Sequence, residues 1–253
     1  MLHSRRTALF AGALYLLTVL TSIPALALKE PALRDPASLG LPDGMTPLLL
    51  AVLLEVVLAA ACVGTAVVLY PVLRRQSEAA ALGFVAARVA EGTLIMIGAL
   101  AMVSLTVIPR MPASVGGDTT SAIPAYAAAG ALVAMHDAAF LLGPGLIPAA
   151  NALLLGGLLY RSRLVPRILP IIGFVGAPLL ALSVVATLFG SIDQVSPIAG
   201  LAALPIAVWE ISLGVWLIAQ GFRPDALARL ADPGNAAASS GTGSNPATPP
   251  LVT

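Results

Sequence analysis

The chain has 253 residues and a formal net charge of +1, and 58% of its residues are hydrophobic while only 10% are charged. Soluble proteins carry about 25% charged residues, so this composition predicts an integral membrane protein. The near-zero net charge argues against a nucleic-acid-binding surface. The only lysine, Lys29, follows no glycine, which excludes a Walker A phosphate loop and argues against ATP hydrolysis. The single cysteine, Cys62, forms no internal disulfide.

Six segments are apolar over the length of about 20 residues that a helix needs to cross a bilayer. The predicted fold is therefore all-α: one polytopic membrane domain over residues 1–223, with six transmembrane helices in one bundle. The predicted helices cover residues 8–28, 48–73, 80–108, 127–160, 168–189 and 198–221. Residues 224–253 are rich in Ala, Gly, Ser and Pro, a composition that buries no core and predicts a disordered tail.

The orientation follows from the basic residues in the loops, because cytoplasmic loops retain arginine and lysine. Of the thirteen basic residues, nine fall on one side of the predicted helices, three on the other, and Arg88 lies within a helix. The count predicts a multi-pass protein of the inner (plasma) membrane with both termini in the cytoplasm. Lys29 and Arg34 are placed in the first outer loop. The first helix also resembles a cleavable signal segment, but its apolar run is long for one, and a retained helix is favoured.

Ionisable side chains inside the predicted helices are the best pointer to function, since each costs several kcal/mol in hydrocarbon unless it is paired or hydrated. The candidate intramembrane polar site consists of Glu55, Arg88, Glu91, His136, Asp137 and Glu210. The rise of about 1.5 Å per residue puts all of them near the membrane midplane, which predicts one shared polar layer. The i, i+3 spacing of Arg88 and Glu91 predicts that these two side chains pair.

The charges of this polar layer do not balance. Four ionised acids and Arg88 sum to minus three, which an apolar medium does not tolerate. Some acids are then protonated, or His136 is charged, or a cation occupies the site. This arithmetic favours a protein that binds or transports a small solute, a proton or a cation. The alternative is a structural or regulatory membrane component in which the polar side chains only fix helix packing through interhelical hydrogen bonds.

The fourth predicted helix is too long for the membrane, because 34 residues extend about 51 Å. It contains a helix-breaking stretch with Gly143, Pro144, Gly145 and Pro148. Broken helices line the binding sites of many transporters, whereas a simple proline kink or a steep tilt is the slightly favoured interpretation. Asn151 is expected to hydrogen-bond the carbonyl groups that the prolines leave free.

Enzymatic chemistry has little support in the sequence, although an intramembrane enzyme stays a third hypothesis. His136 is the only histidine in the predicted helices, so a usual tetrahedral zinc site lacks ligands. No Gly-x-Ser-x-Gly motif and no Cys–His pair suggest a nucleophile. We therefore expect no catalytic residue, no metal and no cofactor. The lipid bilayer is the one expected partner, and the sequence identifies no protein partner.

Several segments together resemble a known family. They are RTALFAGALYLLT at residues 6–18, RVAE at residues 88–91, the His136–Asp137 pair, and GGLLYRSRLVPR at residues 156–167. In order and spacing they resemble the bacterial membrane proteins grouped as domain of unknown function 4386 (DUF4386), over about residues 5–221. The resemblance implies a six-helix integral membrane protein and no known activity. The Gly143-Pro144-Gly145 stretch and Pro148 depart from the pattern expected of that family.

Overall fold

The computed structural model describes residues 2–40, 44–108 and 123–231, and within these ranges the chain is helical and contains no β-strand. A short 3-10 helix, η1 (Pro36–Gly40), follows the first helix. The α-helices are α1 (Leu2–Arg34), α2 (Met45–Leu73), α3 (Glu78–Val107), α4 (Ile123–Leu142), α5 (Ile147–Ser162), α6 (Ile168–Leu188), α7 (Pro197–Ala219) and α8 (Pro224–Ala231).

Six helical segments of the described chain are long and apolar enough to cross a membrane, which confirms the predicted all-α bundle with six spans. Two boundaries differ from the prediction. The first helix continues to Arg34 rather than ending near residue 28, so Lys29 lies inside a helix and is buried instead of lying in a loop. Residues 224–231, which the sequence assigned to a disordered tail, form α8, and the rest of that predicted tail lies outside the described residues.

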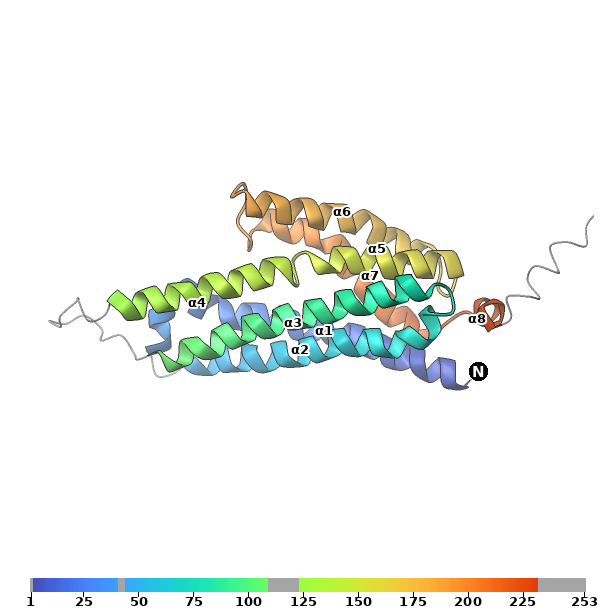
Figure 1. The fold of residues 1–253 in the computed structure, drawn as a ribbon, viewed down its shortest axis with the longest axis horizontal. Helices are drawn as coiled ribbons and strands as arrows, with labels where there is room; N and C mark the ends of the chain where they lie inside the picture. Colours follow the sequence, from blue (N-terminus) through green and yellow to red (C-terminus); the bar gives the residue numbers. More distant parts are fainter. Residues whose placement is uncertain (1, 41–43, 109–122, 232–253) are drawn as a thin grey trace, which may run out of the picture.

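The first and last spans are neighbours, and this contact closes the bundle. α1 packs against α2 and α7, α3 packs against α2, α4 and α5, and α6 packs against α5 and α7. Figure 1 shows α6 and α7 lying beside α5 and stopping short of the far end of α4. The amino terminus and α8 lie at the opposite end of the molecule (Figure 1). The bundle therefore contains all its spans at one end and only α1 to α4 at the other.

Glycines let the helices approach closely where the bundle closes, as is common in membrane proteins. A Cβ atom on Gly12 of α1 would lie 2.6 Å from the backbone oxygen of Gly214 on α7. A Cβ on Gly173 of α6 would lie 3.0 Å from the ring of Trp209 on α7. Larger residues at these two positions would push α7 away from its neighbours.

The fourth predicted helix is interrupted, whereas the sequence slightly favoured a simple kink or tilt. Residues 143–146 form a turn between α4 and α5. Pro144 has no amide hydrogen to donate, and the backbone amide of Gly145 donates instead to the carbonyl of Phe140, five residues earlier, at 2.9 Å. A Cβ on Gly145 would lie 2.3 Å from the carbonyl oxygen of Leu141, so the turn requires glycine there.

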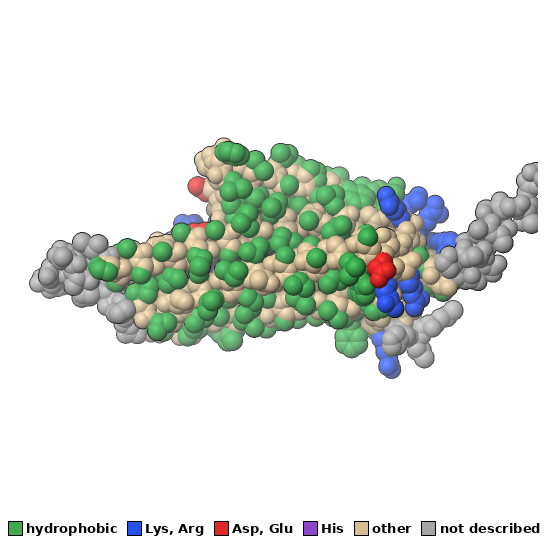
Figure 2. All heavy atoms as spheres, viewed as in Figure 1, with side chains coloured by type: hydrophobic (Ala, Val, Ile, Leu, Met, Phe, Trp, Pro, Cys, Tyr) green, Lys and Arg blue, Asp and Glu red, His purple; other side chains and the backbone are tan. Residues whose placement is uncertain are grey.

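The surface matches a protein surrounded by lipid. Large hydrophobic side chains are exposed along α2, α3, α6 and α7, and Figure 2 shows them spread over the length of the bundle. Lysine and arginine side chains gather at the end that carries the amino terminus and α8 (Figure 2). There Arg5 donates to the backbone oxygens of Leu217 (3.1 Å) and Ile218 (2.6 Å), which caps the last turn of α7.

Candidate functional site

The six predicted site residues form two groups rather than one layer. Arg88, Glu91 and Glu210 meet in the interior, and we call them, together with Asn151, the central cluster. Glu55, His136 and Asp137 lie with Lys29 nearer the end where η1 is found, and we call these four the outer cluster. On α2, Cys62 contacts Arg88 at 3.7 Å, and Glu55 precedes Cys62 by seven residues. Two helical turns along α2, about 10 Å, thus separate Glu55 from the level of the central cluster.

The central cluster is built on three helices around one guanidinium group. Arg88 on α3 is 1% exposed, and its Nη1 donates to Glu91 Oε2 at 3.1 Å, one turn along the same helix. Its Nη2 donates to Glu210 Oε1 on α7 at 3.0 Å. Asn151 on α5 donates from Nδ2 to the same Glu91 oxygen at 2.8 Å. The predicted pairing of Arg88 with Glu91 is therefore present, and Glu210 joins it across the bundle.

Aromatic rings and unpartnered polar atoms surround this cluster. The Arg88 guanidinium lies 5.1 Å from the centre of the Tyr15 ring and 5.9 Å from that of Phe84, distances that suit cation–π attraction. Four buried polar atoms in this region make no hydrogen bond within the described residues: Tyr15 Oη, Arg88 Nε, Asn151 Oδ1 and the indole Nε1 of Trp209. Such buried groups normally have a partner, so the region has spare hydrogen-bonding capacity.

The central cluster carries one more acid than base. Arg88 contributes one positive charge, and Glu91 and Glu210 contribute two negative charges when both are ionised, so the sum is minus one. Glu91 is 4% exposed and Glu210 has a side chain 14% exposed. A buried site does not hold an unbalanced charge without cost. The arrangement therefore suits a bound proton or a monovalent cation.

The outer cluster combines a buried ion pair with an exposed acid. Lys29 on α1 pairs with Glu55 on α2, and both side chains are buried. The Lys29 ammonium lies 4.5 Å from the centre of the Phe140 ring on α4, and that ring stacks on His136. His136 Nδ1 lies 2.9 Å from Asp137 Oδ1, and the Asp137 side chain is 52% exposed. Asp137 therefore faces outward while Glu55 is fully enclosed.

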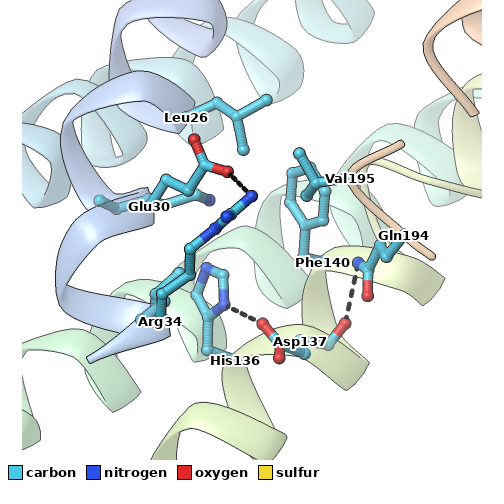
Figure 3. A pocket seen from close by; sticks show the side chains of 10 residues that line it. Leu26, Glu30, Arg34, His136, Asp137, Phe140, Gln194 and Val195 are labelled. Atoms are coloured by element: carbon cyan, nitrogen blue, oxygen red, sulfur yellow. Dashed lines mark hydrogen bonds and ion pairs between the residues drawn. The ribbon is translucent and has the colours of Figure 1, made fainter. Parts of the chain in front are cut away.

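Two adjoining cavities lie between α1, α4 and the turn that joins α6 to α7. The first, which we call the polar cavity, has a volume of about 150 Å³ and is lined by charged groups of α1 and by His136 and Asp137 (Figure 3). The second, the apolar cavity, has a volume of about 210 Å³ and extends past Pro144 and Gly145 to α6 and α7. Both are lined by Phe140 and by residues 26, 194 and 195, so they adjoin, and we call the two cavities together the cleft.

The α6–α7 turn indicates at which level of the bundle each cluster lies. Gln194 of this turn donates to the backbone oxygen of Asp137 at 3.1 Å. The turn and Asp137 therefore lie at the same level of the bundle. Glu210 lies thirteen residues into α7, about 20 Å from the turn. The central cluster thus lies about 20 Å farther along the bundle than Asp137, so the candidate residues do not share one level as the sequence argument expected.

Two residues that the sequence argument placed elsewhere belong to these clusters. Lys29 was counted as a loop residue, and including it changes the charge sum of the candidate residues from minus three to minus two. Asn151 was expected to bind carbonyl groups freed by the prolines, but its amide donates to Glu91 instead. Within the described residues, no three His, Cys, Asp or Glu side chains converge as metal ligands would. The carboxylates of the two clusters are paired with arginine, lysine, histidine and amide partners.

The comparisons with known proteins support the family and add no relative of known activity. Neither the comparison with curated proteins nor that with solved structures gave a match. The family model described as "Domain of unknown function (DUF4386)" matches residues 10–221, which include every residue of the two clusters. The match covers all six spans except the first residues of α1. The chain therefore belongs to the DUF4386 family of multi-pass membrane proteins.

Proposed function

We propose that this protein is a carrier that moves a small solute across the membrane while the central cluster exchanges a proton or a monovalent cation. The observation that carries the proposal is the excess acid of this cluster: Glu91 and Glu210 share the single buried guanidinium of Arg88. Arg88 is already shared by the two carboxylates, so the proton or cation that balances the second carboxylate is not fixed in place and binds reversibly. The end rich in arginine (Figure 2) faces the cytoplasm, across the plasma (inner) membrane.

Asn151 is suited to hydrogen-bond Glu91 both when its carboxyl group is ionised and when it is protonated. In the arrangement described above, its amide nitrogen donates to the ionised carboxylate, while its Oδ1 atom has no hydrogen-bond partner in the described chain. When Glu91 binds a proton, the carboxylic acid becomes a donor, and an Asn151 amide turned end for end offers Oδ1 as the acceptor. The same pair of side chains is then hydrogen-bonded whether the proton is present or absent.

The interrupted helix connects this exchange to the cleft. Phe140, which lines both cavities, lies just before the 143–146 turn, and Asn151 lies five residues after it. Proline and glycine in the turn let α4 and α5 change their relative angle without breaking a full set of helical hydrogen bonds. A change at Glu91 that moves Asn151 is thereby transmitted to the wall of the cleft, which is the coupling that a carrier needs.

The test uses the purified full-length protein in liposomes that contain a pH-sensitive dye. A gradient of sodium, potassium or tetramethylammonium is imposed, and proton movement is recorded. We expect at least one gradient to drive proton movement in the wild type and none to do so in Glu91→Gln or Glu210→Gln. The matched control is Glu78→Gln, which removes an exposed carboxylate at the start of α3 and should behave as the wild type.

A structural role for the same residues is the second candidate, and the Lys29–Glu55 pair favours it because both side chains are enclosed and paired. Under that role, no gradient would drive protons through the wild type, and the amide variants of Glu91 and Glu210 would differ from it only in stability. Folded amide variants without proton movement, beside an active wild type, would support the carrier. A folded Glu91→Gln/Glu210→Gln double variant that still moves protons as the wild type does would overturn it.

A further inference from the structure

The geometry points to the cleft formed by the two adjoining cavities as a binding site for a small organic cation that has an apolar body, with the cationic head in the polar cavity and the body in the apolar cavity. This inference deepens the proposed function by naming the class of solute. Only the movement of the solute rests on the proposed function, because binding of the solute to the cleft is measured separately.

The charge of the polar cavity selects a cationic head. Lys29 is neutralised by Glu55, and Arg34 is neutralised by Glu30 at 2.6 Å. Asp137 remains, and its ion-pair partner in the described chain is His136. A neutral imidazole that donates to Asp137 leaves the negative charge of the carboxylate unbalanced. The cavity wall therefore carries one net negative charge at a pH at which His136 is neutral.

The position of this charge also suits a ligand. The Asp137 side chain is 52% exposed, so a cation reaches it from outside, and Figure 3 shows its carboxylate beside His136. The Phe140 ring lies between the two cavities and lines both. An ammonium head held near Asp137 would place its first apolar group against that ring.

The apolar cavity fits a body of about one ring. Its wall includes Leu180 and Val184 of α6, Ala199, Gly200 and Ala203 of α7, and Pro144 of the helix interruption. Cavities of about 150 Å³ hold benzene, so about 210 Å³ accepts one aromatic ring with a short linker. The two cavities together lie near the lower end of the range for ligand pockets, which suits a compact amphiphile and not a whole phospholipid.

The probe is benzyltrimethylammonium, which joins a quaternary ammonium head to one ring. Binding to the full-length protein in lipid nanodiscs is measured by calorimetry at pH of about 8, where imidazole is neutral, and at low ionic strength. Tetramethylammonium tests the head alone, and benzylsulfonate keeps the ring but reverses the charge. We expect saturable binding of benzyltrimethylammonium that weakens as salt is added, weaker binding of tetramethylammonium, and none of benzylsulfonate.

Two substitutions divide the site into its parts. Asp137→Asn should weaken both cations about three- to tenfold, since it removes a half-exposed charge. Its control is Asp193→Asn, which removes an exposed acid of the same α6–α7 turn outside the cavity lining. Gly200→Leu adds a large apolar side chain to a residue that lines the apolar cavity, and a Cβ placed there meets nothing within 4 Å. It should weaken benzyltrimethylammonium by at least about tenfold and leave tetramethylammonium unchanged.

The control for Gly200→Leu is Gly130→Leu, where an added Cβ also meets nothing within 4 Å but which lies outside both cavities. The inference is overturned if benzylsulfonate binds as tightly as benzyltrimethylammonium, if salt has no effect on the wild type, or if each variant matches its control. If benzyltrimethylammonium binds as described but no cation gradient moves protons, the binding site is supported and the carrier function is refuted. If proton movement occurs in the wild type and is lost in Glu91→Gln, but benzyltrimethylammonium does not bind, the carrier is supported and the binding site is refuted.

Discussion

Replacing Arg88 by glutamine is expected to be the most destabilising single substitution in the central cluster. The guanidinium contacts Glu91 at 3.1 Å and Glu210 at 3.0 Å and is almost fully buried. Without it, two carboxylates remain in a site with no cation. Removing one partner of a buried ion pair costs about 3–5 kcal/mol. This loss is a large part of the roughly 5–15 kcal/mol by which folded proteins are stable.

Glu210→Gln should cost far less, within about 1 kcal/mol. The remaining Arg88–Glu91 pair is balanced, and the new amide oxygen still accepts from Arg88 Nη2 in the place of the carboxylate. The double variant Arg88→Gln/Glu210→Gln should then be more stable than Arg88→Gln alone by about 1–3 kcal/mol, because only one carboxylate is left unpaired.

Unfolding in detergent micelles can be followed by tryptophan fluorescence. Both tryptophans of the chain, Trp209 and Trp216, lie on α7, so the signal reports when α7 leaves the bundle. Arg75→Gln, which removes an exposed arginine between α2 and α3, is the control and should change the midpoint little. The reasoning is refuted if Arg88→Gln is as mild as Arg75→Gln, or if the effects of the Arg88 and Glu210 substitutions simply add.

Three further outcomes are expected. Lys29→Met should lower the unfolding free energy by about 3–5 kcal/mol by leaving Glu55 buried without a cation, and adding Glu55→Leu should recover most of this loss in the same fluorescence assay. Gly173→Leu should cost about 1–3 kcal/mol, since a Cβ there already lies 3.0 Å from an indole ring, whereas Gly157→Leu meets nothing within 4 Å and should unfold like the wild type. Alkaline phosphatase fused after Thr253 should be inactive and a fluorescent protein fused there should fluoresce, because the proposed orientation places either fusion in the cytoplasm. An active phosphatase would show that the orientation is the opposite one.

Local features of the sequence were enough to predict the spans and one ion pair. Each span is a run of apolar residues long enough for the bilayer, a property that one segment shows by itself. Arg88 and Glu91 are three residues apart on one helix, so their contact needs no information about other helices. The Gly143 to Leu146 turn was also visible, because proline and glycine weaken a helix wherever they occur.

The role of Lys29 was missed because the first helix was predicted to end at residue 28, which placed Lys29 in a loop. Pro31 follows closely, yet α1 continues through Pro24 and Pro31 to Arg34. A proline within a helix removes one backbone hydrogen bond, and surrounding contacts can offset that loss. Here the buried pairing of Lys29 with Glu55 holds this part of α1 against α2. Only the fold brings these two residues together, since they lie on different helices.

The single polar layer was wrong for a related reason. Depths were counted along each helix from its own ends, which aligns different helices only when they are similar in length. α1 has 33 residues and α6 has 21, and the α6–α7 turn reaches only the level of Asp137. The relative level of neighbouring helices depends on contacts such as the close approach of Gly92 on α3 to the Ala59 carbonyl on α2. Those contacts are not visible in either segment alone.

The distribution of the central cluster over the chain also affects how the protein is made. Arg88 and Glu91 enter the membrane together on α3 as a balanced pair, which lowers the cost of inserting each. Among the described spans α7 is the last to be synthesised, and it carries Glu210 without any basic residue of its own. A chain that stops before α7 therefore has a neutral interior pair. The surplus acid on which the proposed exchange depends arrives only when the final span docks against α1 and α6.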